Sequence, residues 1–213
     1  MSYWTDYVNA VSARYGARIV DYEVWNEANL KTFWGGSPQQ MADLTTAAYS
    51  VIKANNPNAI VSAASVTTRL HGPMKAFVPL YVQTLATQGF KYDAYAIHTY
   101  PAGDQGPPAR GADILFWEGT IIGSLPSNSP GLAKYIFDTE VNYGVPGPGT
   151  IPGRQYSDAE GAALITQTYQ DSKALGVDAT FWYLYTAKPF SLLGVQLYAG
   201  TPASIAAFNA ITP

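Results

Sequence analysis

Segments with the pattern of a β-strand alternate with segments with the pattern of an amphipathic α-helix along almost the whole chain. We predict strands at residues 20–25, 59–65, 92–100, 134–140 and 177–185, and helices at residues 3–15, 37–55, 73–88, 115–123, 157–176 and 203–209. Such alternation is typical of a parallel sheet covered by helices, and two folds dominate that class: the closed eightfold barrel and the open doubly wound sheet. No Gly-x-Gly-x-x-Gly and no phosphate-loop lysine follows any predicted strand, which argues against a nucleotide-binding doubly wound sheet.

Residues with known roles at helix ends predict several boundaries. Ser2, Ser37 and Ser157 are each placed to cap the N-terminus of a helix, and Glu160 would complete a capping box with Ser157. Proline lacks the N–H that an interior helical position donates, so we expect Pro79 near the first turn of its helix.

The composition limits the kind of partner and the kind of site. With 213 residues the chain is close to the size of one domain, so we expect a single domain over residues 1–213. The net charge is −3 and Lys and Arg are not clustered, so neither nucleic acid nor a membrane surface is expected as a partner. The chain has no Cys and two His, which makes a metal site unexpected, and no motif indicates a cofactor. We find no signal peptide and no run that could span a bilayer, which leaves the compartment open, secretion included.

Polar and aromatic residues stand at or just after the ends of the predicted strands. They are Glu27, His98, Tyr100, Glu140 and Trp182. The C-terminal ends of parallel strands form the rim at which α/β proteins build their sites. Each residue alone has an ordinary explanation, such as a solvated glutamate, a hydrogen-bonded histidine or a core tryptophan. Their occurrence on successive strands favours a common active site.

Four motifs carry a resemblance to a known group of enzymes. They are WNEAN at 25–29, HTYP at 98–101, DTEVNYG at 138–144 and FWYLY at 181–185. In this order they resemble the fourth, sixth, seventh and eighth strand motifs of the clan of retaining glycoside hydrolases built on the TIM barrel, and most of all its xylosidase-like and cellulase-like families. The resemblance implies a partial (β/α)8 TIM barrel, with strands four to eight and their helices. It also implies hydrolysis of O-glycosidic bonds in a β-linked oligo- or polysaccharide.

The resemblance also implies roles for individual residues. Glu27 would be the general acid/base and Glu140 the nucleophile, the pair of carboxyl groups that a retaining mechanism requires. Tyr100 would donate a hydrogen bond to Glu140, Asn26 would bind the sugar 2-hydroxyl, and His98 would orient the polar network.

Three tryptophans are expected to contact the sugar. Trp182 would lie under the sugar being cleaved, and Trp34 and Trp117, both expected on loops, would line outer subsites. No residue distinguishes xylose, glucose, mannose or arabinose, because that choice depends on loop geometry.

One departure from the clan affects the whole prediction. The helix at residues 3–15 leads directly into the strand that carries Glu27, which in the clan is the fourth, so we expect the first three barrel strands to be absent. We therefore expect open edges beside the strands that carry Glu27 and Trp182, covered by self-association or by a partner chain. A carbohydrate-binding or structural protein without turnover remains the alternative. An acyl or phosphoryl hydrolase has no support, since the chain lacks a Gly-x-Ser-x-Gly motif and a metal cluster.

Overall fold

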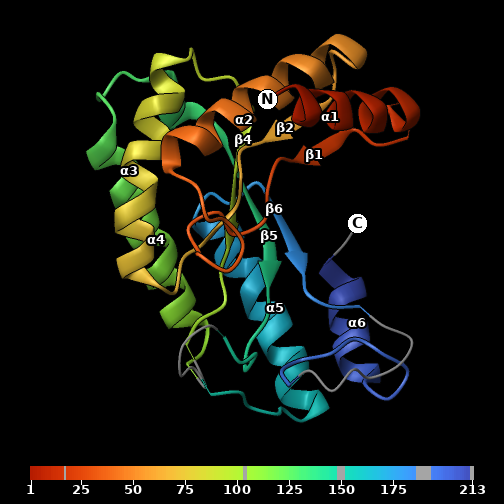
Figure 1. The fold of residues 1–213 in the computed structure, drawn as a ribbon. Helices are drawn as coiled ribbons and strands as arrows, with labels where there is room; N and C mark the ends of the chain where they lie inside the picture. The colour runs from red at the N-terminus through yellow and green to blue at the C-terminus, as the bar shows by residue number, and fades with distance from the viewer. Residues whose placement is uncertain (17, 103–104, 148–151, 186–192, 212–213) are drawn as a thin grey trace. The chain divides into compact units, whose positions relative to one another are not determined.

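The computed structural model describes residues 1–16, 18–102, 105–147, 152–185 and 193–211 (Figure 1). The α-helices are α1 (Ser2–Tyr15), α2 (Pro38–Asn55), α3 (His71–Thr87), α4 (Pro107–Ser124), α5 (Asp158–Ala174) and α6 (Pro202–Ile211), and a 3-10 helix spans Pro130–Ala133. The strands are β1 (Asp21–Glu23), β2 (Ile60–Ser62), β3 (Val66–Thr67), β4 (Ala94–His98), β5 (Tyr135–Val141) and β6 (Ala179–Trp182). The predicted alternation of strands and helices is confirmed.

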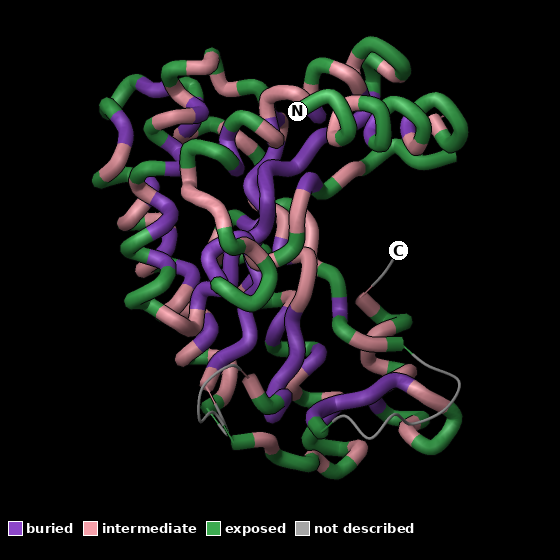
Figure 2. The backbone as a smooth tube through the Cα atoms, in the orientation of Figure 1, coloured by how far each residue is buried: buried purple, intermediate pink, exposed green. Residues whose placement is uncertain are grey.

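The described strands form a sheet with the order β1-β2-β4-β5-β6, and the short β3 pairs with β4. β1 and β2 are parallel, with Tyr22 opposite Val61. β2 and β4 are also parallel, with Ser62 opposite Ala94. All five residues of β4 are buried (Figure 2). This burial is what a parallel strand with both faces covered requires.

The chain divides into two compact units, and each is described by itself. The first unit comprises residues 1–97 and 117–137, and the second comprises residues 98–116 and 138–213. A core cluster of the first unit joins residues of helices and strands: Val8, Val24, Ala48, Ile52, Ala59 and Val61. The corresponding cluster of the second unit is Val141, Tyr143, Ile165, Trp182, Val195 and Leu197.

The N-termini of α2 and α5 have the predicted caps. Ser37 Oγ accepts a hydrogen bond from the Gln40 N–H at 3.2 Å, and Gln40 Oε1 accepts one from the Ser37 N–H at 2.8 Å. Ser157 and Glu160 make the same reciprocal pair at α5. Each capping box satisfies backbone N–H groups that a helix start would otherwise leave without partners.

Three other helix boundaries differ from the prediction. The cap predicted at Ser2 is wrong by one residue, because the Met1 carbonyl already accepts hydrogen bonds from the N–H groups of Trp4 and Thr5. Pro79 lies in the interior of α3 rather than in its first turn, because α3 begins at His71. α4 begins at Pro107 instead of residue 115. Proline is tolerated at the start of a helix because the N–H that it lacks would have no acceptor within the helix there.

Beyond β6 the described chain returns to the sheet within the second unit. Leu197 pairs with Tyr185 in a parallel bridge, and its N–H donates to the Leu184 carbonyl at 3.3 Å. The Asn142 side chain donates to the Val195 carbonyl at 2.7 Å and accepts from the Val195 N–H at 3.0 Å. The edge that we expected to be open beside the Trp182 strand is therefore partly covered by residues 193–198.

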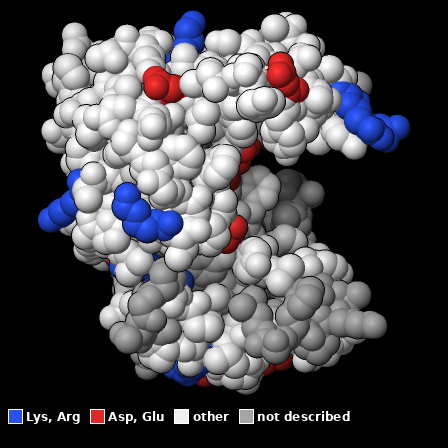
Figure 3. All heavy atoms as spheres, viewed as in Figure 1, with Lys and Arg blue, Asp and Glu red and all other residues white. Residues whose placement is uncertain are grey.

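The face of the molecule in Figure 3 is mostly uncharged, and its Lys and Arg side chains stand apart from one another. Within the described ranges, no helix is long and apolar enough to cross a membrane. The same ranges contain no group of three or more His, Cys, Asp or Glu residues arranged to hold a metal ion.

Candidate active site

Glu140 lies near the end of β5, in the second unit, with two of the predicted site residues beside it. The Tyr100 hydroxyl donates a hydrogen bond to Glu140 Oε2 at 2.6 Å, as predicted. His98 Nδ1 lies 3.7 Å from the same oxygen, and the His98 side chain is 1 % exposed whereas that of Glu140 is 29 % exposed. A hydrogen bond to a carboxylate is stronger than one between neutral groups. The carboxylate is therefore held in position and still reaches solvent.

The backbone under this carboxylate is held by a buried ion pair that the sequence analysis missed. Arg110 from α4 donates to Asp138 Oδ2 at 2.7 Å, and both side chains are 0 % exposed. Arg110 also donates to Thr99 Oγ1 at 2.8 Å, and the Thr99 N–H donates to the Glu140 carbonyl at 3.0 Å. Burial raises the pKa of Asp138, and the charge of Arg110 opposes that rise. An Asp inside a predicted strand is the signal that could have indicated a buried cation nearby.

Glu27 lies in the first unit, on the loop that follows β1. Its N–H donates to Ser65 Oγ at 2.9 Å, and the Ser65 N–H donates to the Trp25 carbonyl at 2.8 Å. The Asn29 side chain also donates a hydrogen bond to the Thr67 carbonyl and accepts one from the Thr67 N–H, each at 3.0 Å. Glu27 has φ 43, a left-handed conformation that costs a non-glycine residue about 1–2 kcal/mol. The loop is thus fixed to the connection after β2, with the carboxylate at a strained position of a kind that is common at functional sites.

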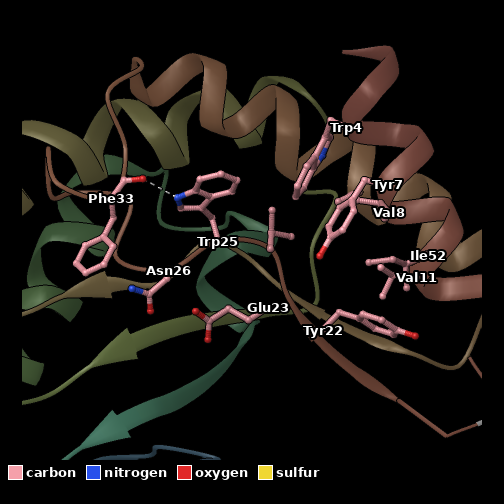
Figure 4. Close-up of a pocket in the computed structure, with 12 residues that line it drawn as sticks. Trp4, Tyr7, Val8, Val11, Tyr22, Glu23, Trp25, Asn26, Phe33 and Ile52 are labelled. Atoms are coloured by element: carbon pink, nitrogen blue, oxygen red, sulfur yellow. Dashed lines mark hydrogen bonds between the residues drawn. The ribbon is translucent and has the colours of Figure 1, made fainter. Parts of the chain in front are cut away.

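Asn26 and Trp34 lie on the same loop region of the first unit. Asn26 is exposed, and it lines a cavity of about 460 Å³ together with Trp25 and Phe33 (Figure 4). The Trp25 indole N–H donates to the Phe33 carbonyl at 3.0 Å. Trp34 packs edge-on against Trp25, with ring centroids 5.6 Å apart, and its own indole N–H donates to the Ser37 carbonyl at 3.1 Å. The loop therefore presents an amide beside a group of aromatic rings.

Trp182, the last residue of β6, belongs to the core cluster of the second unit. It is 8 % exposed, and its ring centroid lies 6.2 Å from that of Tyr143. The indole N–H donates to the Val195 carbonyl at 3.3 Å, so the residues that return beyond β6 fix the orientation of the ring.

The sequence predicts Trp117 within the helix at residues 115–123 and also gives it the role of a loop residue, and the loop position is wrong. Trp117 lies within α4, is 2 % exposed, and packs edge-on against Tyr95 with ring centroids 5.3 Å apart. The Gly/Pro-rich sequence before it has the composition of a long loop, but α4 already begins at Pro107. A ring this deeply buried presents no free face to a sugar.

Comparison with known proteins identifies the fold. Neither a protein-family model nor a curated protein matches the sequence. Among solved structures, a GH39 enzyme from Xanthomonas axonopodis pv. citri matches with a TM-score of 0.65 at 23 % identity, over 98 % of this chain and 45 % of that one. A GH128 (subgroup I) endo-β-1,3-glucanase from Amycolatopsis mediterranei, in complex with laminaripentaose, matches with a TM-score of 0.67 at 20 % identity, over 97 % of this chain and 79 % of that one.

A third match is xylanase 10B from Thermotoga petrophila RKU-1 in complex with xylobiose. Its TM-score is 0.61 at 15 % identity, over 97 % of this chain and 64 % of that one. The predicted α/β class of (β/α)8 TIM-barrel type, in partial form, is therefore confirmed. The chain spans just under half the length of the GH39 enzyme, at 45 %.

Proposed function

We propose that residues 1–213 form the catalytic part of a retaining glycoside hydrolase that cleaves β-linked oligo- or polysaccharides. The observation that carries the proposal is the Glu140 carboxylate, which is held at 2.6 Å by Tyr100 and lies 3.7 Å from His98 at the end of a barrel-type strand. The fold neighbours support a carbohydrate substrate, since they include an endo-β-1,3-glucanase and a xylanase in complex with oligosaccharides.

In the proposed mechanism Glu140 attacks the anomeric carbon while Glu27 protonates the departing glycosidic oxygen. This forms a covalent glycosyl-enzyme, which water then hydrolyses with Glu27 acting as the base. Retaining enzymes hold the two carboxyl groups about 5–5.5 Å apart. Because Tyr100 donates to Oε2, the other oxygen of Glu140 would make the bond to the sugar.

Other predicted residues would bind the substrate. Asn26 is exposed and would make a hydrogen bond with the sugar 2-hydroxyl, as donor or as acceptor. Trp34 would line an outer subsite. Trp182 would lie under the sugar being cleaved and contact it through the small part of the ring that reaches solvent, since it is 8 % exposed and its orientation is fixed by the bond to Val195. The substrate role predicted for Trp117 is not part of this proposal, because that ring is 2 % exposed.

The proposal is tested by hydrolysis of aryl β-xylosides and β-glucosides. Glu140→Gln should lower turnover by at least about 1,000-fold, because the nucleophile is lost, while xylo- or laminari-oligosaccharides still bind. Glu27→Ala should still release dinitrophenol from a dinitrophenyl glycoside in the first step, because this leaving group needs no proton, but should hydrolyse the glycosyl-enzyme slowly because the base is lost. Glu118→Gln on α4 is a matched control and should keep full activity. Equal activity of Glu140→Gln and the unmodified chain would contradict the proposal.

A carbohydrate-binding or structural protein without turnover is the second candidate. The observation in its favour is that the chain matches 45 % of the GH39 enzyme, so more than half of that protein has no counterpart in these residues. Oligosaccharide binding by the unmodified chain, with no hydrolysis of any aryl glycoside, would favour this candidate.

A further inference from the structure

A separate cavity of the first unit lies between the loop that follows β1 and the first turns of α2 and α3. This loop–α3 cavity has a volume of about 430 Å³, within the range of small-molecule sites, roughly 300–1,000 Å³. Loop residues between 28 and 36 line it together with Pro38 of α2 and with Pro73 and Phe77 of α3. It has no lining residue in common with the 460 Å³ cavity beside Asn26.

Trp34 forms an aromatic wall of the loop–α3 cavity, and its ring is fixed in place. The indole N–H donates to the Ser37 carbonyl at 3.1 Å, and the ring packs edge-on against Trp25. A Cβ added at Gly36 would lie 2.5 Å from the Trp34 ring, so the glycine lets the ring lie directly against the backbone. The half-buried indole is therefore oriented before any ligand binds, and a flat aromatic face of this kind suits a sugar ring.

Lys31 lines the same cavity from a part of the loop whose backbone is fixed. The Leu30 N–H donates to the Glu27 carbonyl at 2.9 Å, and the Trp34 N–H donates to the Leu30 carbonyl at 2.9 Å. Leu30 itself is 5 % exposed, whereas Lys31 is exposed. Within the described ranges, the Lys31 side chain makes no hydrogen bond and no ion pair. Its ammonium group is therefore available to a ligand in the cavity.

The charge around the loop–α3 cavity is positive, although the chain as a whole has a net charge of −3. Lys31 is the one charged side chain among the described residues that line the cavity. Neither α2 nor α3 has an acidic residue in its first turn, and Arg69, His71 and Lys75 stand at or near the start of α3. The Asn29 amide is already bonded to the backbone of Thr67. The cavity thus joins an aromatic wall to a cation, and surrounding positive charge favours an anionic ligand.

We propose that the loop–α3 cavity is a subsite for a uronic acid unit of an acidic β-linked oligo- or polysaccharide. The sugar ring packs on Trp34, and the uronic acid carboxylate pairs with the Lys31 ammonium group. This inference rests on the proposed glycoside hydrolase function and names the class of substrate for it.

Calorimetric titration of the Glu140→Gln variant tests the proposal, because binding is measured without turnover. The first probe is a xylotetraose with one glucuronic acid branch, and the second is a β-1,4-linked tetraglucuronate, which carries the acid in the main chain. The control for each is the same oligosaccharide with its carboxyl groups reduced to alcohols. At least one acidic probe should bind about fivefold more tightly than its reduced form, the upper end for an exposed ion pair. This preference should largely disappear at about 1 M salt, where the screening length is about 3 Å.

Variants separate the two walls of the cavity. Lys31→Met should abolish the preference for the acidic probe and leave the affinity for the reduced probe unchanged. Lys91→Met, a matched change at an exposed lysine of the same unit outside this cavity, should keep the preference. Trp34→Ala should weaken the acidic and the reduced probe by a similar factor. Far-UV circular dichroism shows that the variants are folded.

Three results would overturn the proposal: equal affinity for the acidic and reduced probes, equal effects of Lys31→Met and Lys91→Met, or no binding of any probe at millimolar concentration. Hydrolysis of neutral aryl glycosides together with equal affinities would overturn this inference and leave the proposed function standing. A preference for the acidic probe that depends on Lys31, in a chain that hydrolyses no glycoside, would support the uronic acid subsite and contradict the proposed function.

Discussion

Replacing Arg110 by Met would leave a buried carboxylate without its cation. Arg110 and Asp138 are both 0 % exposed and are 2.7 Å apart. The guanidinium also donates to Thr99 Oγ1 and to Ser172 Oγ, each at 2.8 Å. Met is similar in length to the apolar part of Arg and adapts to irregular space, so the substitution mainly removes the charge and the hydrogen bonds.

We expect Arg110→Met to lower the free energy of unfolding by about 3–5 kcal/mol at neutral pH, the range for removing one partner of a buried ion pair. The double variant with Asp138→Leu should recover most of that loss, because no buried charge remains. Burial raises the pKa of Asp138 in the folded chain, and loss of Arg110 should raise it further. The stability that Asp138 contributes by holding its proton in the folded chain is fully present below the pKa that it has in the unfolded chain, about 4. This contribution is lost as the pH rises through the higher pKa of the folded chain. The penalty in Arg110→Met should therefore shrink on acidification.

Urea unfolding followed by far-UV circular dichroism measures these changes. Arg154→Met is the matched control, because the Arg154 side chain is 43 % exposed and pairs with Glu160 at the surface, so its loss should change stability little. The reasoning is refuted if Arg110→Met costs less than about 1 kcal/mol, or if the double variant is no more stable than the single one.

Three further predictions follow from single contacts. Tyr100→Phe removes the 2.6 Å hydrogen bond to Glu140 and should lower kcat/KM on an aryl glycoside by about 10- to 150-fold, equivalent to 1.5–3 kcal/mol; unchanged kinetics would show that the bond does not serve catalysis. Ser37→Ala should lower the free energy of unfolding by about 1 kcal/mol in urea, whereas Ser50→Ala in the same helix should be near neutral, and equal effects would argue against the capping box. Burial raises the pKa of Tyr95 and of Tyr143 to about 12. The free energy of unfolding that these two protonated side chains contribute is therefore fully present below about pH 10 and is lost as the pH rises towards 12. A free energy of unfolding that stays constant from about pH 9 to 11 would contradict this.

Much of the fold could be predicted because its signals are local. The periods of strands and helices depend on neighbouring residues, and a capping box such as Ser157 with Glu160 lies within one turn. Errors occurred where distant contacts decide the structure. Pro79 is tolerated inside α3, whose buried face packs against the rest of the first unit, and local preference alone places it at a helix start.

The candidate site shows the same division. The contact between Tyr100 and Glu140 could be predicted because both residues belong to short motifs at strand ends. The pairing of Arg110 with Asp138 could not, since the two residues are 28 positions apart and a lone Arg in a helix gives no sign of its partner. Trp117 was misplaced because a Gly/Pro-rich sequence resembles a loop even where two prolines begin a helix.

The most direct test of the proposed nucleophile is covalent labelling with dinitrophenyl 2-deoxy-2-fluoro-β-glycosides of xylose and glucose, followed by peptide mass spectrometry. The fluorine slows breakdown of the glycosyl-enzyme, so the nucleophile accumulates the label. We predict one added glycosyl group on the peptide that contains Glu140, retained in Glu27→Ala and absent in Glu140→Gln. A label on any other residue, or no label from a glycoside that the chain demonstrably binds, would contradict the assignment of Glu140 as the nucleophile.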